Sequence, residues 1–238
     1  MAGVAHVATT GADYCEFDVR RTADGVFVVS HDADVATADG PLAIGRTTWA
    51  VLHERAPDVR LATEVAAALA ITDLKAHVDL KSTTSGATRG GPGWERDLAD
   101  LLAEHLTPDR LLFTTGKRTA IAALAAWSSE RGGQALVGLS IGSSTRGLGW
   151  CAALQRRRGE LFPDALFEAS GAGVVVPHHA LATLRLTRWA ARRRVPVLVW
   201  TVDRTWLLWL LLRRRRVWMI TTNRPTLAAR MRDAARGA

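Results

Sequence analysis

The chain has 238 residues, of which 48% are hydrophobic, and a formal net charge of +8. This length and apolar content suit a single large domain with a full core, since α/β barrels commonly run to about 200–250 residues. Cys15 and Cys151 are isolated, which excludes a disulfide framework and a CxxC zinc site. The positive charge suits nucleic acid or an acidic membrane, or reflects arginines on solvated helix faces. Because the arginines are spread over several predicted helices, the second interpretation is favoured.

The N-terminus lacks a basic segment followed by an apolar core, so no signal peptide is predicted. The most apolar run, WLLWLLL at 206–212, is shorter than the ~20 residues that a membrane span needs. We therefore expect a cytoplasmic protein. The run predicts a buried helix; the alternative is a peripheral membrane contact through its tryptophans and the arginines at 213–216.

Strand-like and helix-like segments alternate along the chain. The opening MAGVAHVATT predicts a helix, and the segment 26–31 predicts a hairpin arm after the turn TADG. Strands are predicted at 12–19, 76–82, 110–116, 134–142, 172–179, 195–203 and 217–223. Strands separated by helices pair in parallel, which predicts one α/β domain over 1–238 of the TIM (β/α)8-barrel type. Eight strands close such a barrel, so seven leave it one strand short at the front.

Polar side chains gather at the carboxyl ends of these strands. Glu16 and Asp18 are two residues apart on a strand and share one face, as do Asp79 and Lys81. The carboxyl-end rim is where barrels of this type build active sites. Carboxylate oxygens suit Mg²⁺ or Ca²⁺, and the ammonium of Lys81 suits a phosphate oxygen.

Four segments resemble the signature of the glycerophosphodiester phosphodiesterase family. They are GADYCEFDVRRTADGVFVVSHD at 11–32, HVDLKS at 77–82, VPVLVWTVD at 195–203 and MITTNRP at 219–225. They occur in the family's order and cover nearly the whole chain. The resemblance implies a phosphoric diester hydrolase whose metal-dependent reaction releases glycerol 3-phosphate and an alcohol from a small glycerophosphodiester.

The resemblance also implies a role for individual residues. The implied metal ligands are Glu16, Asp18 and Asp79. His31 is implied as the general acid on the departing alcohol, Lys81 as the phosphate-binding residue, and Trp200 as a wall of the glycerol pocket.

The sequence departs from the family pattern at two points. Asp79 stands where the family usually has Glu, which keeps the carboxylate but shortens it by one methylene. The family's His-Arg-Gly and Glu-Asn-Thr segments would lie before Met1. The resemblance therefore implies that this form lacks one catalytic histidine and has impaired activity.

Two other functions stay open at this point, and so do the roles of three histidines. A barrel of this kind could bind phosphodiesters without hydrolysing them, or act as a lysophospholipase D-like lipid phosphodiesterase. No nucleic-acid partner is expected. His77 is expected in the core, whereas the pair His178 and His179 either lines the pocket or has a capping or packing role.

Overall fold

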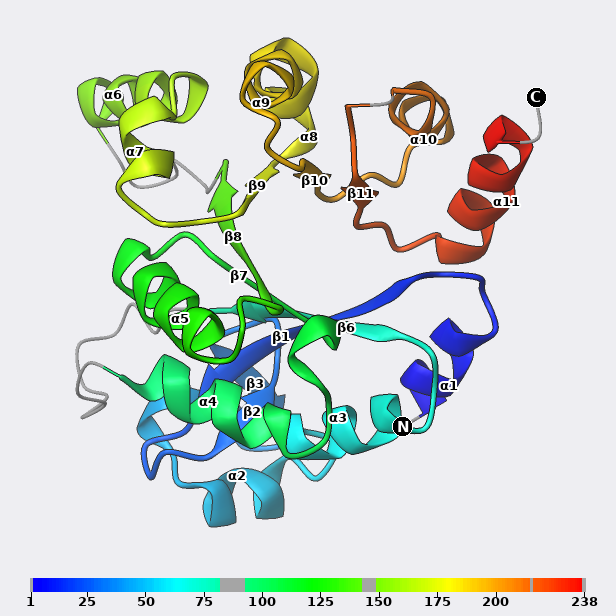
Figure 1. Ribbon diagram of the computed structural model, residues 1–238. Coiled ribbons are helices and arrows are strands. Elements are labelled where there is room, and N and C mark those ends of the chain that lie inside the picture. The colour runs from blue at the N-terminus through cyan, green and yellow to red at the C-terminus, as the bar shows by residue number, and fades with distance from the viewer. Residues whose placement is uncertain (1, 82–92, 143–148, 215, 237–238) are drawn as a thin grey trace.

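The computed structural model describes residues 2–81, 93–142, 149–214 and 216–236 (Figure 1). The strands are β1 Tyr14–Arg21, β2 Phe27–Val29, β3 Asp34–Thr37, β4 Gly40–Ala43, β5 Arg60–Leu61, β6 Lys75–Leu80, β7 Leu111–Thr115, β8 Leu136–Ile141, β9 Val174–Pro177, β10 Leu198–Val199 and β11 Met219–Ile220. The α-helices are α1 Ala2–Ala8, α2 Trp49–Arg55, α3 Ala62–Ala70, α4 Trp94–Ala103, α5 Arg118–Glu130, α6 Trp150–Leu161, α7 Asp164–Glu168, α8 His179–Leu181, α9 Thr187–Arg193, α10 Thr205–Leu212 and α11 Pro225–Arg236. Short 3₁₀ turns cover Ile44–Arg46 and Pro108–Arg110, and a π-helical turn covers Ala182–Leu186.

The predicted α/β barrel architecture is confirmed, with seven parallel strands. β1, β6, β7, β8 and β9 are neighbours in that order in one sheet. Parallel bridges at Val175–Val197 and His178–Trp200 join β9 to the β10 segment, and β10 pairs in parallel with β11. All seven predicted strands are present. The first has the predicted length but begins and ends two residues later, at Tyr14–Arg21, and the other six are shorter than predicted because only their central residues carry ladder hydrogen bonds.

A second group of strands lies beside β1. β2 pairs antiparallel with β1, from Val19–Val29 to Arg21–Phe27, which confirms the predicted hairpin arm. β5 extends this edge, and β3 and β4 form a separate hairpin that the sequence analysis did not predict. The amide of Ser30 donates to the carbonyl oxygen of Asp18 at 3.0 Å, so β2 holds the loop that follows it against the carboxyl end of β1.

The barrel is open between β1 and β11. The amides of Lys75 and Lys81 donate to the carbonyls of Asp13 and Val19. The backbone groups of odd-numbered residues of β1 therefore form the hydrogen bonds with β6. The backbone groups of Tyr14 and Glu16 therefore point to the opposite edge. In the described part of the chain no strand pairs with Tyr14 or Glu16 on that edge, which β2 covers only further along, and β11 pairs with β10 alone.

A cavity of about 740 Å³ fills this opening, lined by parts of α1, β1, β11 and α11. Figure 1 shows α1 and α11 on the same open side of the molecule. An aromatic contact and an ion pair span the opening. The rings of Tyr14 and Trp218 meet edge to face with centres 6.0 Å apart. The guanidinium of Arg232 lies 2.9 Å from the carboxylate of Asp13.

The helix expected to be buried, α10, is buried on one face only. Leu207, Leu208 and Leu211 lie in the core. Trp206 is 60% exposed and Trp209 is 51% exposed. The prediction was wrong for the outer face, because the helical repeat of 3.6 residues turns these tryptophans away from the barrel. No helix among the described residues is long and apolar enough to cross a membrane.

Candidate active site

Three carboxylates converge at the carboxyl ends of β1 and β6. Glu16 and Asp18 come from β1 and Asp79 from β6, and one oxygen of each lies within 4.8 Å of the others. The strands pair in parallel register with Asp18 opposite Asp79, which places both carboxylates at the same level of the barrel. The structure therefore brings together all three predicted ligands.

The ammonium of Lys81 lies between two of these carboxylates. Its Nζ is 2.8 Å from Asp18 Oδ1 and 2.5 Å from Asp79 Oδ2. Burial lowers the pKa of Lys81, but the adjacent carboxylates of Asp79 and Asp18 outweigh burial and raise the pKa above its ordinary value. Lys81 therefore carries a positive charge within the cluster. The sequence analysis expected this ammonium to bind a phosphate oxygen, and here it contacts two carboxylates.

The charge of Lys81 does not neutralise the whole cluster. Burial raises the pKa of Glu16 to about 8, and the charges of Asp18 and Asp79 add to the effect. Because of this raised pKa, Glu16 retains a proton near neutral pH unless a cation enters, and the part of the residue that faces solvent leaves a path for that cation. Three oxygen donors with an uncompensated negative charge suit a hard divalent cation.

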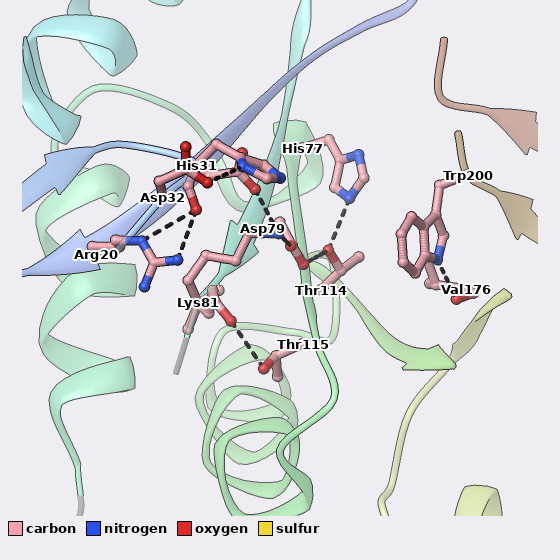
Figure 2. A network of polar contacts seen from close by, with 12 residues as sticks. Arg20, His31, Asp32, His77, Asp79, Lys81, Thr114, Thr115, Val176 and Trp200 are labelled. Carbon is pink, nitrogen blue, oxygen red and sulfur yellow. Dashed lines mark hydrogen bonds and ion pairs between the residues drawn. The ribbon is translucent and has the colours of Figure 1, made fainter. Parts of the chain in front are cut away.

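A buried hydrogen-bonded pair holds Asp79 in place. Thr114 of β7 donates its hydroxyl hydrogen to Asp79 Oδ1 at 2.8 Å, and His77 Nε2 lies 2.9 Å from the same hydroxyl oxygen. Because a hydroxyl has one hydrogen, His77 must be the donor to Thr114. Burial lowers the pKa of His77 to about 4, so the ring is neutral. Figure 2 shows the chain from His77 through Thr114 to Asp79.

His31 lies next to this cluster but does not bond to it. It follows Ser30, whose amide binds the Asp18 carbonyl, and Arg20 donates two hydrogen bonds to the carbonyl oxygen of His31. The ring is exposed, and its Nδ1 is 2.9 Å from the carboxylate of Asp32 (Figure 2). In the described structure its Nε2 has no protein partner, so this nitrogen is available to a substrate.

Trp200 and the two neighbouring histidines form the opposite side of the rim. The indole of Trp200 donates to the carbonyl oxygen of Val176 at 2.9 Å and meets the ring of His178 edge to face. His178 accepts the amide of Ala180 at the start of α8, which is a capping role, and His179 Nδ1 is 3.0 Å from the carbonyl of Thr201. Figure 2 places Trp200 beyond His77 and Thr114 as seen from Lys81. Both histidines thus have structural partners.

A family comparison decides the classification of this chain. The sequence profile of the Glycerophosphoryl diester phosphodiesterase family matches residues 1–227. The chain belongs to this family. Its members are phosphodiesterases, so the chain is assigned to the phosphoric diester hydrolases. No curated protein sequence matches significantly.

Solved structures agree with the family in fold. A structure from Silicibacter pomeroyi DSS-3 that is assigned to the same enzyme family has a TM-score of 0.76 at 19% identity, over 99% of this chain and 88% of that one. A glycerophosphodiester phosphodiesterase from Parabacteroides distasonis has a TM-score of 0.71 at 18% identity, over 98% and 88%. A phosphodiesterase from Oleispira antarctica, solved with the product sn-glycerol-3-phosphate, has a TM-score of 0.69 at 15% identity, over 99% and 90%.

The sequence analysis missed Thr114 and left His77 as a core residue. The sequence did contain a signal for Thr114, because FTTG places two hydroxyls at the end of a predicted strand, where rim residues lie. The expectation that His77 is buried is confirmed, since it is 4% exposed. Its contact with Thr114 depends on the pairing of β6 with β7, which no local pattern specifies.

Proposed function

We propose that this chain hydrolyses small glycerophosphodiesters to glycerol 3-phosphate and an alcohol in a cation-dependent reaction. The observation that carries the proposal is the convergence of Glu16, Asp18, Asp79 and Lys81 at one point of the rim. The product complex of the Oleispira antarctica relative supports the substrate class. The donor set supports Mg²⁺ or Ca²⁺ rather than a softer metal.

In this proposal the chain's own residues bind the phosphate and move the proton. Glu16, Asp18 and Asp79 hold the cation, which offsets phosphate charge when bound. Lys81 then turns its ammonium from the carboxylates toward a phosphate oxygen. Trp200 forms an apolar wall for the glycerol carbons.

His31 supplies the proton to the departing alcohol oxygen. The carboxylate of Asp32 accepts Nδ1–H and fixes the ring, which leaves Nε2 to face the substrate. A histidine side chain can give or take a proton near neutral pH, and a positioned general acid accelerates such a step by about 10²–10⁴-fold.

Cation binding and turnover test the proposal together. With Mg²⁺ or Ca²⁺ present, the protein should convert glycerophosphocholine to glycerol 3-phosphate, and a chelator should stop the reaction. Calorimetry should show cation binding that Asp18→Ala removes. The matched control is Asp73→Ala, an exposed carboxylate next to the other end of β6, which should bind normally. Equal cation binding by both variants would refute the assigned site.

A second candidate function is binding of phosphodiesters without turnover. The open side between β1 and β11 favours it, because the cavity there reaches Glu16 and no described strand in it supplies a further acid–base group. Binding of glycerophosphocholine by calorimetry without release of glycerol 3-phosphate would support this candidate over the first.

A further inference from the structure

The outer face of α10 is apolar although it faces solvent. Between Thr205 and Arg213 the helix contains only leucine and tryptophan. Its three buried leucines pack in the core, whereas Trp206 and Trp209 on the other side are more than half exposed. A helix on the surface of a water-soluble barrel normally has a polar outer face. Large exposed apolar side chains that lie next to one another indicate an interaction site.

Helix α4 of the same molecule provides the contrast. Leu98, Ala99 and Leu102 of α4 are buried, and its outward residues include the exposed Asp97 and Asp100. α4 therefore has the expected division into an apolar and a polar face. Exposed tryptophans are therefore not a feature of every outer helix of the barrel, although α6 also exposes Trp150 and Leu154.

Basic side chains adjoin the tryptophans. Residues 206, 209 and 213 lie three and four positions apart, so they follow one face of the helix. The Arg213 guanidinium lies 4.2 Å from the centre of the Trp209 ring. In the described part of the chain, no carboxylate pairs with the exposed Arg204, Arg213 or Arg216. We call Trp206, Trp209 and Arg213 the outer face of α10.

The basic residues of the chain are concentrated in the C-terminal part, which contains α10. Residues 143–238 contain 18 arginines and five acidic residues, a net charge of 18 − 5 = +13. Residues 1–142 contain 13 basic and 18 acidic residues, a net charge of 13 − 18 = −5. The outer face of α10 thus lies within the basic part of a bipolar molecule. Such a division orients a protein toward an anionic surface.

We propose that the outer face of α10 docks on an anionic lipid membrane. Indole rings settle at the boundary between head groups and acyl chains, where the ring is apolar and its N–H meets water. Arginines beside them attract anionic head groups. A helix with this composition lies in the plane of the interface. Paired tryptophans beside leucines on a convex helix fit a lipid surface better than a nucleic acid, which needs a groove or a row of stacked bases.

The helix begins at Thr205, two residues after Asp203 in the loop that follows β10. Asp203 accepts hydrogen bonds from the amide and the side chain of Asn223, which holds the loop before α10 on the loop after β11. Trp206 is therefore held near the carboxyl-end rim. Docking through α10 would place the rim beside the lipid–water boundary. This inference stands on α10 alone and does not need the proposed hydrolysis.

Vesicle sedimentation tests the inference. The full chain should bind vesicles of equimolar phosphatidylcholine and phosphatidylglycerol, and bind pure phosphatidylcholine more weakly. Trp206→Gln with Trp209→Gln should lower binding at least ~10-fold, since burying one large apolar side chain shifts an equilibrium by about that factor. Arg213→Gln should lower it about fivefold on the anionic vesicles only.

The control uses a tryptophan exposed elsewhere. Trp150 of α6 is 76% exposed, and Trp150→Gln should bind vesicles like the parent chain. A cooperative melt checks that each variant is folded. Equal loss in the Trp150 and α10 variants, or no preference for phosphatidylglycerol, would overturn the inference. So would binding of single-stranded DNA that needs Trp206 and Trp209 while vesicles stay unbound.

Discussion

The two edges of β1 differ in how completely they are paired. Toward β6 the strand is paired in parallel register from Tyr14 to Val19. On the other edge β2 covers only the segment from Val19 to Arg21, and the rest faces the cavity of about 740 Å³. The paired edge places Asp18 opposite Asp79. The open edge places backbone groups against a space that no described strand fills.

This difference separates two parts of the proposed site. The carboxylates and Lys81 need only β1, β6 and β7, which form a continuous sheet. We therefore expect cation binding to persist whether or not the barrel closes. A group that reaches the substrate from between β1 and β11 depends on closure. Perturbing each edge in turn tests the separation.

Filling the open edge should have the largest effect. A form extended at its N-terminus by an apolar strand ending in His-Arg-Gly should hydrolyse glycerophosphocholine about 10²–10⁴-fold faster, since one positioned acid–base group contributes that much. The added strand should pair with Tyr14 and Glu16 of β1 and raise the melting temperature, because it supplies hydrogen-bond partners for the backbone groups of that edge. Turnover and thermal melting of both forms measure this.

The matched control has the same extension with its strand residues changed to Gly and Ser. This form should remain slow and melt like the 238-residue chain, since glycine and serine do not pack as a central strand. Equal turnover and equal melting of all three forms would show that the open edge does not limit the enzyme.

Removing the imidazole of His31 should have a smaller effect that depends on the substrate. In the extended form, His31→Ala should slow choline release from glycerophosphocholine by ~10²-fold or more, and release of p-nitrophenol much less. An activated leaving group departs without a proton, so it does not need the acid. Initial rates on both substrates provide the measurement.

His53→Ala serves as the control for this change, because His53 is exposed on α2 and stacks on Trp49 away from the rim. It should leave both rates unchanged. If His31→Ala slowed both substrates by the same factor, His31 would not be the general acid.

The paired edge should show the smallest effect, a pH dependence of cation affinity. Glu16, whose pKa burial and Asp18 raise to about 8, must lose its proton before it binds a cation. Affinity should therefore rise about tenfold per pH unit below pH 8 and level off above it. Calorimetry in buffers of different ionisation enthalpy should detect the released proton.

The same shift has a defined effect on stability without a cation. A raised carboxyl pKa stabilises the fold at acid pH, and this contribution is lost as the pH rises from the ordinary glutamate range through about 8. Glu16→Gln should flatten both pH dependences while retaining the fold. A steep pH dependence of cation affinity in Glu16→Gln would assign the proton to another group.

The strands and the carboxylate cluster were predictable because they follow local patterns. Alternation along β1 puts Glu16 and Asp18 on one face, and the parallel order of β1 and β6 brings Asp79 to the same end. The β3–β4 hairpin was not predicted because its strands are short and none of their residues is buried, so no apolar alternation marks them. The π turn at Ala182–Leu186, in which Thr187 Oγ1 donates to the carbonyl of Ala182 at 3.1 Å, was not predicted either.

The sequence alone thus determined the order of seven parallel strands, the residues at their carboxyl ends and the three clustered acids. Those features depend on side-chain periodicity and on the rule that strands joined by helices run in parallel. Tertiary structure decided the rest: the ammonium of Lys81 between two carboxylates, the buried chain from His77 through Thr114 to Asp79, and the exposed tryptophans of α10. Each of these depends on which elements pack against one another, and packing joins residues that are far apart in the sequence.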